Sequence, residues 1–139
     1  LLHGRRALKS TQKYLMAQKL MTFYEMIKAN GEFYIAKVPK NDSFMCNLTE
    51  RHYFDEQKLD ILLEAIRNID MVNEEVLYLV WTIYNNLNSS FAYHFNTKDG
   101  YSINNFHWEE NDDEYLAIQD KIRKSFYKFF WNLLPHSTN

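Results

Sequence analysis

Glycine and proline are scarce in this sequence: three glycines and two prolines occur among its 139 residues. Disordered and loop-rich chains are rich in these residues and poor in apolar ones, whereas here apolar residues make up 46% of the chain and aromatic residues 17%. A domain of this length buries roughly two-thirds of the surface that its unfolded chain exposes. We therefore predict a single helix-rich domain over residues 10–139, preceded by a disordered basic segment over residues 1–9.

Cysteine occurs once, at Cys46, which excludes an internal disulfide bond and any metal site with several cysteine ligands. A single cysteine also favours a reducing compartment, so we expect an intracellular protein of the cytoplasm or nucleus. The abundance of Asn, Lys, Tyr, Phe and Ile is typical of an A/T-rich source such as a parasite or virus, in which case the location would be a host cell. The chain begins with Leu1, as expected of a segment of a longer protein or of a processed form.

Long apolar runs and local catalytic signatures are also missing. No run approaches the roughly 18 apolar residues of a membrane span, so membrane insertion is not expected. The glycines Gly4, Gly31 and Gly100 are scattered, which excludes a phosphate-binding loop of the Walker or dinucleotide type. The His-Glu-x-x-His and Gly-x-Ser-x-Gly signatures are absent as well. The sequence therefore predicts no cofactor, no metal site and no catalytic residue, and it favours a protein that is not an enzyme.

A small enzyme without a local motif is one alternative. It would use His94 and His107, near Cys46 or a carboxylate, or the acidic run of residues 109–114. A catalytic pair is defined by mutual geometry, and nothing in the spacing of these histidines requires it, so structural or surface roles are favoured. The acidic run lacks the alternating ligands of a calcium loop, whereas acids are favoured at a helix N-terminus. We interpret the run as a helix cap.

Charge is distributed unevenly, although the net charge is only −2. Residues 1–40 carry +6, residues 41–120 carry −12 and residues 121–139 carry +4. The basic start indicates a second alternative, a nucleic-acid-binding domain that holds phosphates mainly through its N-terminal helix. Its contacts would be Arg5, Arg6, Lys9, Lys13 and Lys19. A strongly basic domain is typical of such proteins, and the pI near 6.2 is not, so a solvated helix face is favoured.

Apolar residues at helical spacing predict a first helix over residues 10–30 and a second over about 55–69. Asn30-Gly31 would end the first helix, because both residues adopt the left-handed conformation that stops helices. Between these helices, the β-branched and aromatic residues 32–38 are followed by turn residues and then by the apolar residues 44–46. This pattern predicts a short β-hairpin.

The third helix is predicted to begin after Asn73, which is a favourable N-cap followed by two acids. It ends near Asn88 or continues to Phe95. Beyond it, alternating residues and the Asp99-Gly100 pair predict a second hairpin over residues 91–103. The fourth helix follows the cap at 111–113 and ends at Leu134-Pro135. The predicted fold is mainly α, a single-domain bundle of about four helices with one or two short β-hairpins.

The most informative segment is residues 125–134, Ser-Phe-Tyr-Lys-Phe-Phe-Trp-Asn-Leu-Leu. It holds more apolar bulk than one core-facing stripe of a helix can bury, so the surplus must pack on another layer of the fold or on a partner. Trp, Tyr and Phe are enriched at protein interfaces. We therefore predict a non-enzymatic interaction module of regulatory, inhibitory or adaptor type, which docks a protein partner or a second copy of itself. The predicted contacts are Tyr127, Phe130, Trp131, Lys124, Lys128, Trp81 and Tyr84.

Overall fold

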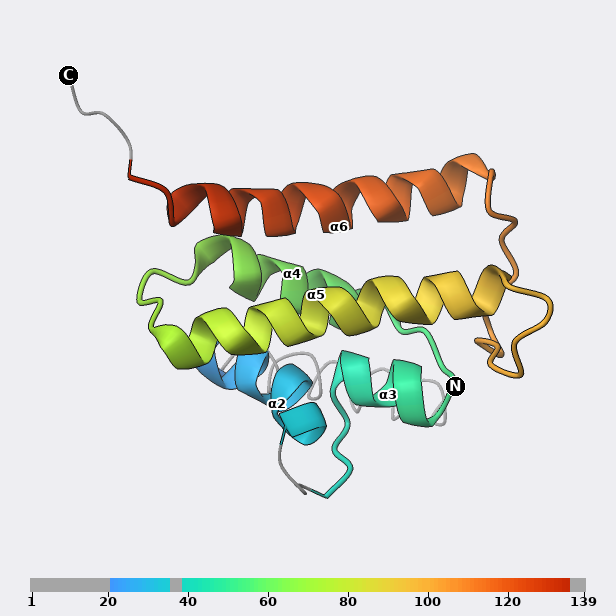
Figure 1. Ribbon diagram of the computed structural model, residues 1–139, viewed down its shortest axis with the longest axis horizontal. Helices are drawn as coiled ribbons and strands as arrows, with labels where there is room; N and C mark the ends of the chain where they lie inside the picture. The colour runs from blue at the N-terminus through green and yellow to red at the C-terminus, as the bar shows by residue number, and fades with distance from the viewer. Residues whose placement is uncertain (1–20, 36–38, 136–139) are drawn as a thin grey trace, which may run out of the picture.

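The computed structural model describes residues 21–35 and 39–135, and within them it contains five α-helices and no strand (Figure 1). The prediction of a mainly α fold is confirmed. The helices are α2 (Phe23–Ile35), α3 (Phe44–Glu50), α4 (Glu56–Asn68), α5 (Glu74–Phe95) and α6 (Asp113–Asn132). None of these described helices is both long enough and apolar enough to span a membrane.

The helices pack around one hydrophobic core. Helix α2 packs on α4 and α5, α6 packs on α4, and the short α3 contacts α2, α4 and α5. In Figure 1 the two longest helices, α5 and α6, lie alongside each other, and α2 and α3 lie on the side of α5 away from α6. Every helix supplies fully buried side chains to the core, among them Ile27, Leu48, Leu62, Ile83 and Phe126.

Two predicted helix starts are confirmed by their caps. The Asp55 side chain accepts a hydrogen bond from the Lys58 backbone N–H, and Asn73 accepts one from that of Val76. Each cap satisfies a donor that the first turn leaves unpaired. Helix α5 then continues to Phe95, the later of the two predicted ends.

The predicted helix stop at Asn30-Gly31 is wrong, because α2 continues through both residues to Ile35. The buried Asn30 amide donates to the Met26 carbonyl and accepts from the Met45 backbone N–H, which ties α2 to the start of α3. Gly31 lies against Leu79 of α5, where a side chain would meet it. Asn30 and Gly31 are therefore explained by their contacts with α3 and α5 and not by a helix end. The part of the predicted first helix before residue 21 lies outside the described residues.

The first predicted hairpin is wrong where the structure describes it. Residues 32–35 belong to α2, and residues 44–50 form α3, whose first turn is capped by the Ser43 side chain. Residues 36–38 lie outside the described residues. Phe44, Met45 and Cys46 are buried in the core as one turn of helix, so their apolar character reflects burial rather than strand pairing.

The second predicted hairpin is also wrong. Residues 91–95 are the last turn of α5, where Phe91 is buried beside Phe106 and Tyr115. The Asp99-Gly100 turn leads into a loop whose Asn105 side chain bonds the Phe54 backbone and whose Asn104 backbone N–H donates to the His52 carbonyl. No described residue here forms a strand.

Helix α6 begins at Asp113, within the acidic run of residues 109–114 and at the predicted helix start. Asp113 and Glu114 lie in its first turn, where the helix dipole favours negative charge. Asp112 occupies the N-cap position, but its carboxylate accepts from the backbone N–H of Glu109 instead of capping the helix.

Candidate protein-docking surface

Helices α5 and α6 meet chiefly through large aromatic side chains. Tyr84 of α5 lies with its ring centre 5.0 Å from that of Phe126 and 6.2 Å from that of Phe130. Trp81, one turn earlier on α5, contacts Phe130 edge to face at 6.4 Å. Rings in these geometries attract each other beyond the burial of their area. The sequence-predicted residues Trp81, Tyr84 and Phe130 are therefore brought together in one contact between two helices.

At the C-terminal end of α6 the aromatic residues turn outward. Tyr127 and Trp131 are one helical turn apart, and their rings stack with centres 6.2 Å apart and planes 9° apart. Tyr127 keeps 66% of its surface exposed and Trp131 49%. These two residues lie on the face of α6 away from the buried Ile122, Phe126 and Phe129.

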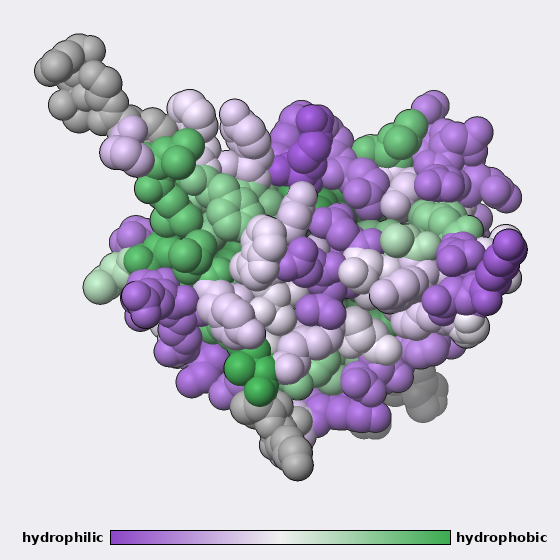
Figure 2. Space-filling view, in the orientation of Figure 1, coloured by the Kyte–Doolittle hydropathy of each residue, from purple (hydrophilic) through white to green (hydrophobic). Residues whose placement is uncertain are grey.

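These residues form one surface over two helices, here called the aromatic surface. It consists of Leu77, Tyr78, Trp81 and Tyr84 of α5 with Tyr127, Phe130 and Trp131 of α6. A hollow of about 410 Å³ lies within it, lined by Glu74, Leu77, Tyr78, Trp81 and Phe130. Figure 2 shows hydrophobic residues gathered over the C-terminal end of α6 and the first turns of α5, whereas hydrophilic residues dominate the opposite end of this face.

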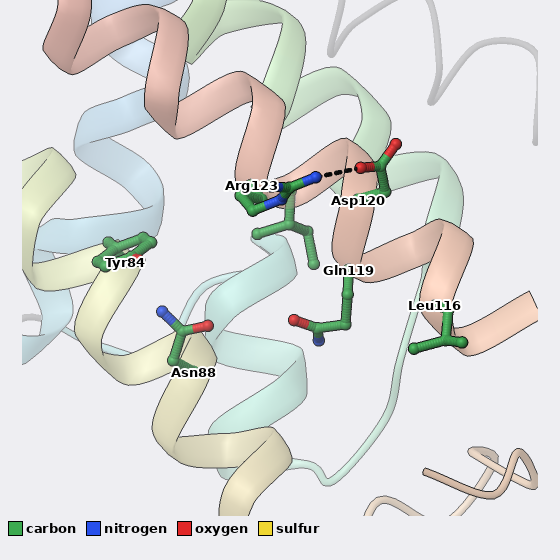
Figure 3. Close-up of a pocket in the computed structure, with 7 residues that line it drawn as sticks. Tyr84, Asn88, Leu116, Gln119, Asp120 and Arg123 are labelled. Atoms are coloured by element: carbon green, nitrogen blue, oxygen red, sulfur yellow. Dashed lines mark hydrogen bonds and ion pairs between the residues drawn. The ribbon is translucent and has the colours of Figure 1, made fainter. Parts of the chain in front are cut away.

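A second hollow, of about 330 Å³, lies further along the same pair of helices (Figure 3). Here the residues that face each other are polar: Asn88 of α5 and Gln119 of α6 extend toward one another, and Leu116 lies at the outer rim. The Gln119 amide donates to the Tyr115 hydroxyl at 2.9 Å. The row of rings between the helices is interrupted at this point, so the hollow is lined partly by amides.

The basic residues predicted for the rim lie on α6. Lys124 is exposed and forms an ion pair with Asp120 at 2.8 Å, to which Arg123 also binds at 2.7 Å. These two cations lower the pKa of Asp120. Lys128 is exposed one turn further on. Lys121 instead faces α4, where it pairs with Asp60 at 2.8 Å and with Glu56 at 3.6 Å.

The residues named for the enzyme alternative, Cys46, His94 and His107, each contact different residues. Cys46 is buried in α3 near Arg51, and His107 is exposed beside Trp108. His94 accepts a hydrogen bond on Nδ1 from the Ile103 backbone N–H, and burial lowers its pKa. Among the described residues, no group of three or more His, Cys, Asp or Glu side chains is placed to hold a metal ion.

The five residues of the nucleic-acid alternative, Arg5, Arg6, Lys9, Lys13 and Lys19, lie outside the described residues, as does the segment 1–9.

The predicted contacts omit several exposed apolar residues of this region. Tyr78 keeps 57% of its surface exposed and lines the larger hollow, and Leu116 keeps 51%. Leu116 lies eleven residues before Tyr127 and eighteen before Leu134. These spacings return to the same face of a helix, so a search for a second apolar stripe on α6 would have found Leu116.

No protein-family model matches this chain, and neither a curated protein nor a solved structure does. Its function has to be inferred from its own residues.

Proposed function

We propose that this protein is a non-enzymatic interaction module that docks a protein partner through the aromatic surface. The observation that carries the proposal is the outward stack of Tyr127 and Trp131 on α6. Neither ring is needed to fill the core beneath it, since Ile122, Phe126 and Phe129 already occupy the buried face.

Burial of these rings by a partner would stabilise a complex. An aromatic side chain has roughly 150–250 Å² of surface, so covering the exposed half of one ring contributes about 2–3 kcal/mol at ~25 cal/mol per Å². Trp and Tyr dominate the energetics of many interfaces for this reason. Tyr127, Trp131 and the half-buried Phe130 would act as the anchors, and the hollow beside Trp81 would accept an apolar side chain of the partner.

The charged rim gives this surface a preference among partners. Arg123, Lys124 and Lys128 lie beside the rings, and their exposed charges would speed encounter with an acidic surface. A protein of this kind acts by occupying its target, as an adaptor or inhibitor does, and requires no catalytic group.

Site-specific photo-cross-linking tests the proposal. A benzophenone amino acid is placed at Tyr127 of the full chain, in cells that naturally express it. The matched control carries it at Tyr53, which is also half exposed but lies in the loop before α4. We expect a discrete cross-linked protein from position 127 and not from position 53. Equal cross-linking at both positions, or none at either, would contradict docking at the aromatic surface.

A further inference from the structure

The charges around α6 are separated along its length. Residues 109–120 contain six acids and no lysine or arginine, whereas residues 121–128 contain four basic residues and no acid. Lys121 is directed to α4, so Arg123, Lys124 and Lys128 supply the exposed positive charge. The exposed surface of this helix is therefore negative at its start and positive in its second half.

An exposed apolar stripe runs through both charged regions. Leu116 lies near the acidic start of α6, and Tyr127 and Leu134 lie in its second half. The three residues fall within about 20° of one another on a wheel of 3.6 residues per turn. Trp131, stacked on Tyr127, widens the stripe at the C-terminal end. The stripe lies opposite the core-facing residues, and Leu116, Tyr127 and Leu134 each keep at least half of their surface exposed.

We infer that the partner of this surface is a second copy of the same chain, with the two α6 helices packed antiparallel about a two-fold axis. The inference rests on the proposed function and specifies its partner. An antiparallel pair brings the acidic start of each helix against the basic half of the other, whereas a parallel pair would oppose like charges. A two-fold axis requires a surface complementary to itself, and α6 carries both signs of charge and apolar groups in both halves.

One register pairs Leu116 with Tyr127 and also places opposite charges across the axis. In an antiparallel pair of identical helices, one helix ascends in residue number where the other descends. The residue numbers of any two facing positions therefore add up to the same value. When Leu116 faces Tyr127 of the second copy, Asp120 therefore faces Arg123, which is its own neighbour within each chain. Lys128 then faces position 115 of the second copy, two residues from the exposed Asp113. This register covers the most exposed ring of α6 with an apolar side chain and allows the Asp120 ion pairs to be shared across the axis.

Charge reversal tests this pairing directly. The first variant reverses acids at the start of α6, Glu110→Lys with Asp113→Lys. The second reverses bases in its second half, Lys124→Glu with Lys128→Glu. Sedimentation equilibrium of the full chain over a concentration series measures the mass of each protein alone and of an equimolar mixture. The control is Glu64→Lys with Lys98→Glu, which reverses exposed charges away from this face.

The wild type and the control variant should form a dimer with the same dissociation constant. Each charge-reversed variant alone should dissociate about 10-fold more readily or worse, since like charges then oppose each other. The mixture should restore the dimer, because the lysines introduced in one variant then oppose the glutamates introduced in the other, while the unchanged acids and lysines still oppose each other at the second end. Circular dichroism establishes that each variant keeps the helical content of the wild type.

A wild type that stays monomeric at all concentrations would overturn the inference, as would a dimer that survives both charge reversals. Neither result would contradict the proposed function, because cross-linking at Tyr127 to a different protein would still support it. Conversely, a dimer that the charge variants disrupt and the mixture restores would support the antiparallel pairing by itself.

Discussion

Gly31 of α2 lies directly against Leu79 of α5: a Cβ atom at position 31 would come within 2.9 Å of Leu79 Cδ2 and 3.2 Å of its backbone oxygen. The glycine is in the interior of a helix, where it costs roughly 1 kcal/mol relative to alanine. That cost is offset by the close approach of α2 and α5, which allows Ile27 and Ile83 to be fully buried.

Gly31→Ala should therefore destabilise the protein, although alanine is the better helix former. The added methyl group must displace the buried Leu79 side chain, and overpacking of this kind costs about 1–3 kcal/mol, which exceeds the gain in helix propensity. Urea denaturation measures the change in the free energy of unfolding. Gly100→Ala is the matched control, since nothing lies within 4 Å of its added Cβ. A stabilised Gly31→Ala variant would show that α2 and α5 are not in close contact.

Asn105 holds the long loop after α5 against the segment before α4. Its side-chain oxygen accepts from the Phe54 backbone N–H, and its amide donates to the Phe54 carbonyl, both at 2.7 Å. Asn105→Ala removes both hydrogen bonds to the Phe54 backbone and should lower the free energy of unfolding by about 1–3 kcal/mol. Hydrogen exchange should show faster exchange at the Phe54 amide. The neighbouring Asn104→Ala should change neither quantity appreciably, because Asn104 contributes its backbone N–H and not its side chain.

Alanine substitutions on the buried and on the exposed face of α6 should differ in their effect on stability. Phe126→Ala empties a fully buried site and should cost about 3–5 kcal/mol of stability, whereas Tyr127→Ala, one residue further, should cost less than about 1 kcal/mol. Thermal unfolding at a protein concentration below the dissociation constant of any dimer measures both. If Tyr127→Ala or Trp131→Ala unfolds the isolated chain, these rings are core residues and cannot be the anchors of an interface.

The histidine at the end of α5 should make stability depend on pH. Burial holds the pKa of His94 below its ordinary value, and Nδ1 accepts from the Ile103 backbone N–H, so the folded state favours the neutral ring. The unfolded chain then binds the proton more readily. The contribution of His94 is complete above about pH 6.5 and is lost as the pH falls below that value.

Denaturation of the wild type and of His94→Asn at pH 7.5 and 5.5 measures this effect. Asparagine can keep an acceptor for Ile103 and does not titrate, so the loss of stability on acidification should be smaller in the variant. His107→Asn, at an exposed histidine, is the control and should resemble the wild type. The assignment would be wrong if both variants lost stability on acidification as the wild type does.

The sequence by itself determined the helices whose signals are local. Residues 55–69 and those after Asn73 repeat apolar side chains at helical spacing and begin at residues that cap with their own side chains. The surplus of apolar bulk in residues 125–134 was also foreseeable, since the buried face of one helix accommodates only part of it, but the sequence did not decide which of these rings stay exposed. All of these features depend on neighbours within about one or two turns of the chain.

Tertiary structure alone decided the elements whose conformation depends on contacts with residues far away in the sequence. Gly31 looks like a helix stop in the sequence, and only Leu79, on another helix, shows that it is a packing residue. The segment at 91–95 alternates like a strand, yet its rings pack on Phe106 and Tyr115 as the last turn of α5. The same holds for the half-buried Tyr84 and Phe130, whose exposure is set by the separation of α5 and α6. Local pattern cannot supply this information, because the free energy of these contacts depends on the placement of residues far apart in the chain.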